Sequence, residues 1–76
     1  MWKEENNYLV REFTFKDFKR AFAFMIQVAA LAEEMQHHPL WTNVYNKLEI
    51  KLNTHDAGNI ITQKDRDLAA AIDKLL

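Results

Sequence analysis

The sequence predicts one α+β domain in which helices pack on one face of a four-stranded antiparallel sheet. Apolar residues alternate as they do in strands in "YLVREFTF" and "LEIKL", and they recur at helical spacing over residues 18–35 and again near the C-terminus. In chain order these segments are strand, strand, helix, strand, strand, helix. Because the chain has only 76 residues, we expect a single domain over residues 1–76.

The first two strands are expected to form a short hairpin. Tyr8–Phe15 is rich in β-branched and aromatic residues, which favours a strand although its polar and apolar residues alternate imperfectly. The preceding "WKEENNY" predicts a shorter strand. Asn6-Asn7 predicts the tight turn between the two, because asparagine tolerates positive φ.

A long helix is expected next. Thr14 and Asp17 have the spacing of a capping box, so the helix should begin there and run to about Met35. Two adjacent apolar stripes cover about half of its circumference. They comprise Phe18, Phe22, Met25, Ala29 and Ala32, and Ala21, Phe24, Val28, Leu31 and Met35. A helix lying on one sheet needs a narrower arc, so two interpretations stay open: a deeply packed core helix, or one that also makes a subunit contact on its flank.

The second hairpin follows the only proline. Pro39 cannot continue the helix, and "LEIKL" alternates as a strand with one apolar face. If Asn46-Lys47 is the turn, Tyr45 faces Leu48 across the hairpin and Trp41 lies on the same side. The later "HDAGNII" contains the only glycine and is expected to be a loop.

The last helix has a clear start. Thr62 and Asp65 form a second capping-box pattern, and Leu68, Ile72 and Leu75 follow at helical spacing. Both helices are therefore amphipathic and can cover the same face of the sheet.

The composition disfavours several classes of protein. With 10 basic and 11 acidic residues and no concentration of positive charge, the chain lacks the usual footprint of a nucleic-acid-binding protein. The N-terminus has no apolar leader, and Ala21–Ala32 is shorter than the ~20 residues of a membrane span. We therefore expect a cytoplasmic protein that binds neither membrane nor nucleic acid directly.

Small size and absent cysteine together favour association. No disulfide can stabilise the chain, although 49% of its residues are hydrophobic. Small domains without such cross-links often gain stability by oligomerising. A homodimer is the simplest expectation, and a tetramer is the next.

Three histidines are the candidate functional residues. His37 and His38 stand between a helix and a strand, and His55 stands where a strand enters the glycine loop, so all three lie at ends of elements. Zinc would require three converging imidazoles, whereas adjacent histidines tend to point apart, and a serine or cysteine nucleophile is absent. General acid–base catalysis needs neither a metal ion nor a nucleophilic side chain, and it is the chemistry that we favour.

The motif that contains the three histidines resembles the signature of a known family. Glu33, three residues, "HHP", five residues, Tyr45, nine residues, His55 and then Asp65 is similar to the signature of the pterin-4a-carbinolamine dehydratases. The segments "FTFKDFKRAFAFM", "THDAG" and "DLAAAID" also resemble that family. The resemblance covers nearly the whole chain from Trp2 onward.

The resemblance implies an enzyme that dehydrates 4a-hydroxytetrahydropterin to quinonoid dihydropterin, which in animals recycles the cofactor of aromatic amino-acid hydroxylases. It implies no metal and no cofactor, and a pterin as the small-molecule partner. The implied catalytic residues are His37, His38 and His55. The implied substrate-binding residues are Glu33, Pro39, Trp2, Thr54 and Asp65. For the pterin wall, Trp41 is an alternative to Trp2, and for both tryptophans core packing is an equal alternative.

Other interpretations remain beside this one. Asp65 can serve only as a helix cap, or it can orient a histidine. A non-catalytic pterin-handling or protein-binding module on the same scaffold is the alternative function, since animal members also act as dimerisation cofactors for a homeodomain transcription factor. Family members usually have a helix before the first strand, which is absent from this sequence, and often an acidic residue where Gln36 stands.

Overall fold

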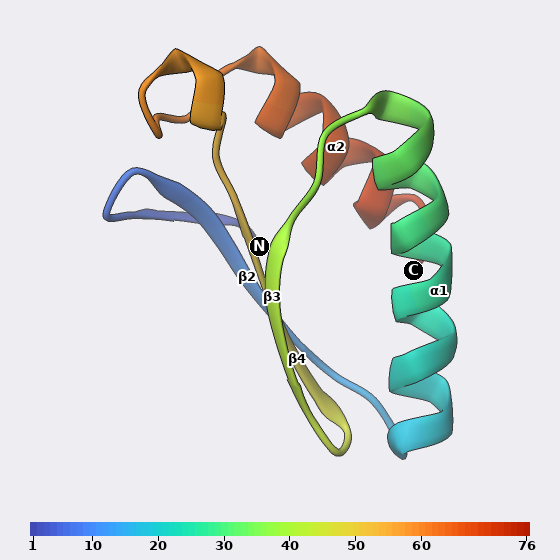
Figure 1. Ribbon diagram of the computed structural model, residues 1–76. Helices are drawn as coiled ribbons and strands as arrows, with labels where there is room; N and C mark the ends of the chain where they lie inside the picture. Colours follow the sequence, from blue (N-terminus) through green and yellow to red (C-terminus); the bar gives the residue numbers. More distant parts are fainter.

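The computed structural model describes all of residues 1–76 and confirms the predicted α+β order of elements. The strands are β1 (Lys3–Glu5), β2 (Tyr8–Thr14), β3 (Leu40–Val44) and β4 (Lys47–Leu52), the helices are α1 (Phe18–Met35) and α2 (Gln63–Asp73), and a short 3-10 turn, η1 (His55–Ala57), precedes α2. All strand pairs are antiparallel, and the strand order is β1-β2-β4-β3. Both helices cover the same face of this sheet (Figure 1).

The first hairpin forms as predicted. Asn6 and Asn7 both have positive φ, at 50° and 68°, and they connect β1 to β2. In the centre of the sheet β2 pairs with β4, where Leu9 lies opposite Leu52. The outer edges of the sheet are β1 and β3.

The predicted start of α1 was wrong by one turn. Thr14 is the last residue of β2, where it pairs with Lys47, so it is unable to cap the helix. Asp17 is itself the N-cap, and its Oδ1 accepts a hydrogen bond from the Arg20 backbone N–H at 2.9 Å. An aspartate at this position satisfies one of the free N–H groups at the helix start.

Only part of the predicted apolar arc of α1 faces the sheet. Ala21, Phe24, Val28 and Ala32 are buried, and Met25 and Leu31 pack against the core. Phe18 and Phe22 are about half exposed. The core interpretation therefore holds for most of the arc, and the subunit contact stays a prediction.

The turn of the second hairpin was predicted one residue too late in the chain, which set the strand pairing two residues out of register. β3 ends at Val44, which pairs with Lys47, so Tyr45-Asn46 forms the turn. Asn46 is fixed by Phe15, because its carbonyl accepts the Phe15 N–H at 2.8 Å and its amide donates to the Phe15 carbonyl at 2.9 Å. A shift of two residues keeps each side chain on its face, so Trp41 still packs against the core.

The core lies between the sheet and the helices. Its ten members are Leu9, Phe13, Phe24, Val28, Leu48, Ile50, Leu52, Leu68, Ala69 and Ile72. The alternation predicted for "LEIKL" is confirmed, since its apolar side chains are almost fully buried. The predicted capping box of α2 is also present: the Thr62 N–H donates to Asp65 Oδ2 at 2.8 Å.

Candidate active site

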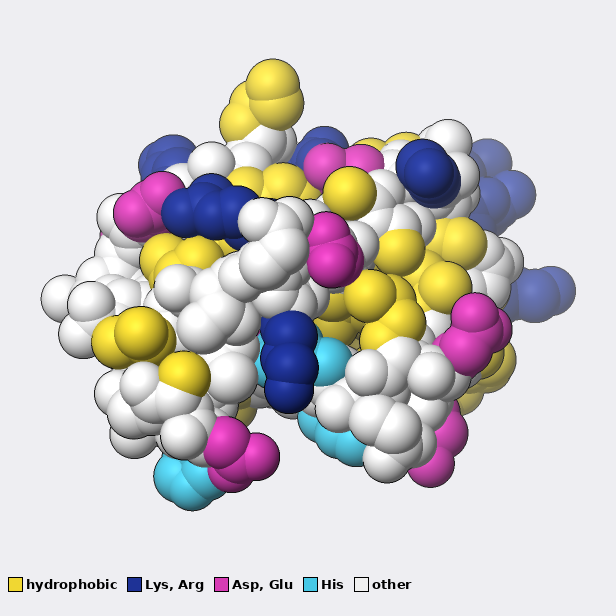
Figure 2. Space-filling view, turned by 90° about the horizontal axis from the view of Figure 1, so that it is seen from above, with side chains coloured by type: hydrophobic (Ala, Val, Ile, Leu, Met, Phe, Trp, Pro, Cys, Tyr) yellow, Lys and Arg dark blue, Asp and Glu magenta, His cyan; other side chains and the backbone are white.

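A polar pocket at one end of the molecule contains all three histidines. It has a volume of about 230 Å³. Its lining residues are Gln36, His37, His38, Asn53, Thr54, His55, Asp56 and Lys64. They come from the end of α1, the end of β4, η1 and the start of α2. Figure 2 views this end of the molecule and shows histidine side chains gathered along one side of it, with a basic side chain beside one of them.

The end of α1 directs the first two histidines. Gln36 has a positive φ of 52° and reverses the chain, and the His37 N–H then donates back to the Ala32 carbonyl at 3.0 Å. This is a Schellman-type helix end, in which a left-handed residue terminates the helix. His38 follows, and Pro39 leads the chain into β3. The local sequence thus places two adjacent imidazoles at the mouth of one pocket.

His37 rests on a buried carboxylate. Its Nε2 lies 2.5 Å from Asp65 Oδ1, and the Asp65 side chain is fully buried. Asp65 Oδ2 accepts the Thr54 hydroxyl at 2.9 Å in addition to the Thr62 N–H. An ionised carboxylate can only accept hydrogen bonds, so in this contact the proton is on Nε2 of His37. Asp65 therefore caps α2 and orients His37 at the same time.

The hydroxyl groups behind Asp65 form a directed chain. Thr54 uses its hydroxyl proton for Asp65, so in the 2.6 Å contact between Thr54 Oγ1 and Thr62 Oγ1 it is Thr62 that donates. Thr54 is itself buried. This chain fixes the carboxylate from behind and leaves its other oxygen to the histidine.

His38 has an exposed partner. Its Nε2 lies 2.9 Å from Glu33 Oε1, on the last turn of α1. The hydrogen bond from His38 lowers the pKa of the Glu33 carboxyl below its ordinary value of 4.5, and the positive charge on the imidazole adds to this. Glu33 does not line the pocket, so its contact with the site runs through His38.

His55 opens η1 and is held locally. Its Nδ1 lies 3.0 Å from Asn59 Oδ1. Gly58, with a φ of 93°, lets the chain turn back between these two residues. Each of the three imidazoles thus has one ring nitrogen engaged by the protein and one without a protein partner: Nδ1 of His37 and His38, and Nε2 of His55.

Four of the five predicted substrate-binding residues, all except Thr54, lie outside the pocket lining. Trp2 lies at a different hollow, where its indole N–H donates to Asp73 Oδ1 at 2.9 Å and its ring packs edge-on against Phe13. Pro39 links His38 to β3 without lining the pocket. The structure therefore gathers the histidines with Thr54, sets Glu33 and Asp65 one contact behind them, and leaves Trp2 apart.

Four lining residues were absent from the sequence-based prediction. They are Gln36, Asn53, Asp56 and Lys64. Each is adjacent in sequence to a predicted site residue, which is the signal that would have found them. The Asn53 Nδ2 is buried without a hydrogen-bond partner, and no other side-chain nitrogen or oxygen is in that state. A buried donor without an acceptor costs free energy, so this amide stands out in the wall of the pocket.

The geometry offers no ready cage for a metal ion. No group of three His, Asp or Glu side chains converges closely enough to hold one. Nε2 of His37 and of His38 each face a different carboxylate, and His55 turns its Nδ1 to an asparagine. The arrangement is suited to proton transfer between imidazole and ligand.

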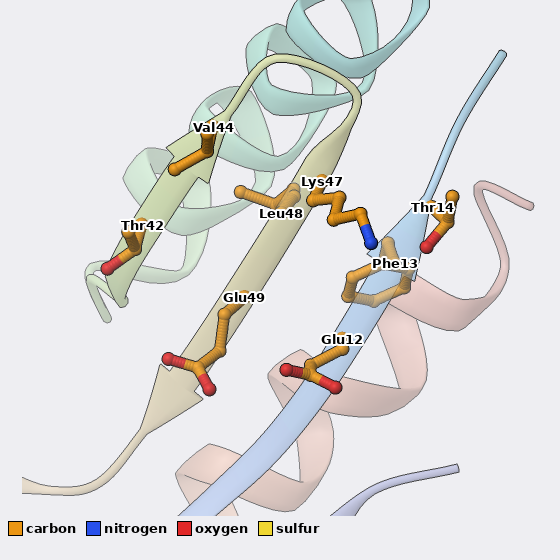
Figure 3. Close-up of a pocket in the computed structure, with 8 residues that line it drawn as sticks. All are labelled: Glu12, Phe13, Thr14, Thr42, Val44, Lys47, Leu48 and Glu49. Carbon is orange, nitrogen blue, oxygen red and sulfur yellow. The ribbon is translucent and has the colours of Figure 1, made fainter. Parts of the chain in front are cut away.

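A second hollow lies on the other face of the sheet and carries different chemistry. It has a volume of about 330 Å³, and Figure 3 shows it with the helices behind the strands. Glu12 and Glu49 are cross-strand partners there, and neither forms an ion pair. No imidazole lines this hollow, so we place the candidate active site at the smaller histidine pocket.

Fold and site together define a small α+β domain with a histidine-lined polar pocket backed by a buried carboxylate. Comparison with known proteins agrees with this description. The family model described as pterin 4 alpha carbinolamine dehydratase matches residues 1–75. The chain belongs to this family, and the resemblance inferred from the histidine motif is confirmed.

Individual relatives support the assignment. A protein of Synechococcus sp. (strain WH7803) is 54% identical over 97% of this chain and 78% of its own length, and one of Solibacter usitatus (strain Ellin6076) is 55% identical over 97% and 77%. Both are named provisionally as pterin-4-alpha-carbinolamine dehydratases.

Two solved structures share the fold. A crystal structure described as a transcriptional coactivator/pterin dehydratase from Brucella melitensis has a TM-score of 0.90 and 39% identity, covering 96% of this chain and 79% of its own. A pterin dehydratase-like protein described as a RuBisCO assembly factor in the alpha-carboxysome has a TM-score of 0.81 and 28% identity, covering 97% and 87%. Neither helix of the present chain is long and apolar enough to span a bilayer.

Proposed function

We propose that the protein is a hydro-lyase that converts 4a-hydroxytetrahydropterin to quinonoid dihydropterin and water. The single observation that carries this proposal is the convergence of His37, His38 and His55 on one pocket, each with one ring nitrogen free. Membership of the family supplies the substrate class. By regenerating a dihydropterin, the reaction would serve pterin recycling.

The reaction needs only proton transfer. The C4a–O bond breaks, the departing oxygen takes one proton and leaves as water, and a ring N–H of the pterin gives up one proton. No electrons are exchanged with another molecule. Because an imidazole can donate or accept a proton near neutral pH, one histidine can protonate the oxygen while another takes the ring proton. Positioned groups of this kind contribute ~10²–10⁴-fold.

The pocket assigns a distinct position to each histidine. His37 is the most rigid, because its ring is nearly buried and Asp65 holds it from behind. His38 and His55 lie at the exposed rim. Asn53 lies in the same pocket wall, and its buried Nδ2 has no partner within the chain. Lys64 adds a positive charge at the same rim.

The direct test measures the appearance of quinonoid dihydropterin from enzymatically generated 4a-hydroxytetrahydropterin, with and without the protein. The wild type should accelerate it, and the His37→Ala/His55→Ala double variant should reduce the acceleration strongly. Glu12→Gln, on the opposite face of the sheet, is the matched control and should keep the wild-type rate. Full activity in the double variant would show that the histidine pocket is not the active site.

A non-catalytic role is the second candidate function, because two solved structures that share the fold are described with such roles. The Brucella protein is described as a coactivator as well as a dehydratase, and the carboxysome protein as an assembly factor. A protein-binding module on this scaffold would bind a partner without pterin turnover. The same assay separates the two functions, because a module of this kind leaves the rate at its uncatalysed value.

A further inference from the structure

The lining of the histidine pocket also contains one carboxylate and one ammonium group that no histidine engages. They belong to Asp56, in η1, and to Lys64, in the first turn of α2. Neither side chain forms an ion pair with the other or with any further residue. Both also line an adjoining hollow of about 390 Å³. Two opposite charges therefore face the same space without neutralising each other by contact.

The backbone fixes the places from which these two charges project. At the start of α2 the capping box holds the turn that carries Lys64. In η1 the Gly58 N–H donates to the His55 carbonyl at 3.0 Å, which closes the turn that carries Asp56. Figure 1 shows η1 and the start of α2 at the same end of the molecule. The pocket thus has a negative side chain on one element and a positive side chain on the next.

Two other carboxylates at the site are already engaged by imidazoles. Glu33 contacts Nε2 of His38, and Asp65 contacts Nε2 of His37. When either imidazole is protonated, its own carboxylate balances the positive charge. Of these three carboxylates, Asp56 is therefore the one whose charge is left to act on a ligand.

The proposed dehydration separates charge inside the same pocket. As the C4a–O bond breaks, its electron pair goes to the oxygen, and the lone pair of the neighbouring ring nitrogen forms a C=N bond to C4a. The oxygen is negative until an imidazole protonates it to water, and the ring is positive until a ring N–H gives its proton to another imidazole. Charges that are already in place where such charge develops stabilise the transition state without having to reorganise.

We infer that Asp56 and Lys64 form an electrostatic pair that supports this charge separation, with Asp56 stabilising the ring cation and Lys64 the departing oxygen. The inference rests on the proposed function. Both side chains are exposed, so solvent screens them, and each charge should contribute about three- to tenfold to kcat. KM should change little, because the charge separation arises only as the bond breaks.

The first experiment measures kcat and KM in the dehydratase assay. Asp56→Asn and Lys64→Gln should each lower kcat about three- to tenfold with KM nearly constant, whereas Asp56→Glu and Lys64→Arg should keep most of it. Added salt should lower the wild-type kcat towards that of the neutral Asp56→Asn/Lys64→Gln variant, whose own kcat should not respond. A purely structural role would give no such salt dependence. Glu49→Gln/Lys47→Gln removes the same two charges from the opposite face of the sheet, and this matched control should keep the wild-type kcat.

The second experiment tests the direction of the field. Asp56→Lys/Lys64→Asp reverses the two charges at constant net charge, so it should be slower than the neutral double variant. Because both side chains are exposed, all of these variants should keep the far-ultraviolet circular dichroism of the wild type. A wild type that does not accelerate the reaction would refute the proposed function and this inference together. An active wild type whose kcat is unchanged in the neutral double variant, or a reversed variant at least as fast as the neutral one, would overturn this inference alone.

Discussion

His37 and Asp65 are joined by a 2.5 Å contact between Nε2 and a carboxylate that is fully buried. The two residues are 28 positions apart, at the end of α1 and in the first turn of α2. The contact therefore ties the two helices together at the pocket. It also determines which nitrogen of His37 is available to a ligand, because Nε2 already gives its proton to Asp65.

Asp65→Asn should lower kcat about 10–100-fold with little change in KM. The amide nitrogen of the asparagine would face Nε2 of His37 and invert the tautomer, as happens when a carboxylate behind a catalytic histidine becomes an amide. KM should be nearly constant because Asp65 is too deeply buried to contact substrate. Steady-state kinetics checks this, with Asp73→Asn as control: Asp73 bonds Trp2 and Arg11 away from the pocket. An unchanged kcat would mean that Asp65 acts only as a helix cap.

Thr54→Val tests the support behind the carboxylate. The substitution keeps the shape of the side chain and removes the hydroxyl that donates to Asp65. We expect a loss of stability of about 1 kcal/mol, the usual worth of one such hydrogen bond, and a smaller fall in kcat than in Asp65→Asn. Urea denaturation and the dehydratase assay measure the two effects. A loss of stability with wild-type kcat would mean that the hydroxyl chain serves folding only.

The three histidine-to-alanine variants should differ from one another in stability, although each should lower turnover by at most ~10²-fold. His37→Ala leaves a buried oxygen of Asp65 without its partner, which costs about 1–3 kcal/mol. His38→Ala and His55→Ala remove exposed contacts and should unfold at nearly the wild-type urea concentration. If His37→Ala is as stable as the other two, the buried dyad does not stabilise the fold.

The Glu33 carboxyl should titrate below pH 4.5 in the wild type, because the His38 hydrogen bond lowers its pKa. At the pH where carboxyl groups titrate, an imidazole is normally protonated, so the pair is then oppositely charged. Since the pKa is lowered in the folded state, the stabilising effect of the pair is present above the unfolded value and is lost as pH falls through the folded one. Carbon-detected NMR titration should show the midpoint rising towards 4.5 in His38→Ala and staying in place in His55→Ala.

Dialysis against a strong chelator should leave the dehydratase rate unchanged. The expectation rests on the proton-transfer chemistry of imidazole and on the lack of three converging ligand side chains. The measurement compares rates before dialysis, after it, and after zinc is added back. A rate that collapses and returns with zinc would instead assign a metal to the pocket.

Much of the fold was predictable because its signals are local. The alternation of "LEIKL", the Asn6-Asn7 turn and the Thr62 capping box each depend on a few adjacent residues, and all three are confirmed. The start of α1 was wrong because Thr14 is held by β2 and β4, a pairing between distant segments. Local propensity is overridden where such a contact competes with it.

The candidate site was likewise predictable where its signals are local and unpredictable where they depend on contacts between distant segments. The sequence placed His37, His38 and His55 at element ends, and the fold brings them into one pocket. From the sequence, Asp65 could either orient one of the histidines or cap the helix; the structure shows both roles in one side chain, with His37 as the histidine. Choosing between them from sequence was impossible, because the answer depends on how the ends of α1 and α2 meet.

The strained turn between β3 and β4 gives a last prediction, which is that Tyr45→Gly should stabilise the protein. Tyr45 has a φ of 53° and an exposed side chain. The next residue, Asn46, would tolerate a left-handed backbone better, but its hydrogen bond to Phe15 fixes its own position. A left-handed backbone costs a bulky residue about 1–2 kcal/mol of stability, and glycine removes this cost. Glycine also gives the unfolded chain more conformational freedom, which offsets part of the gain, so we expect a net increase in stability of about 0.5–1 kcal/mol. Thermal unfolding at fixed protein concentration measures it. Thr42→Gly, on β3 with an ordinary φ, is the matched control and should be destabilised; an equal loss in both variants would show that the turn carries no strain.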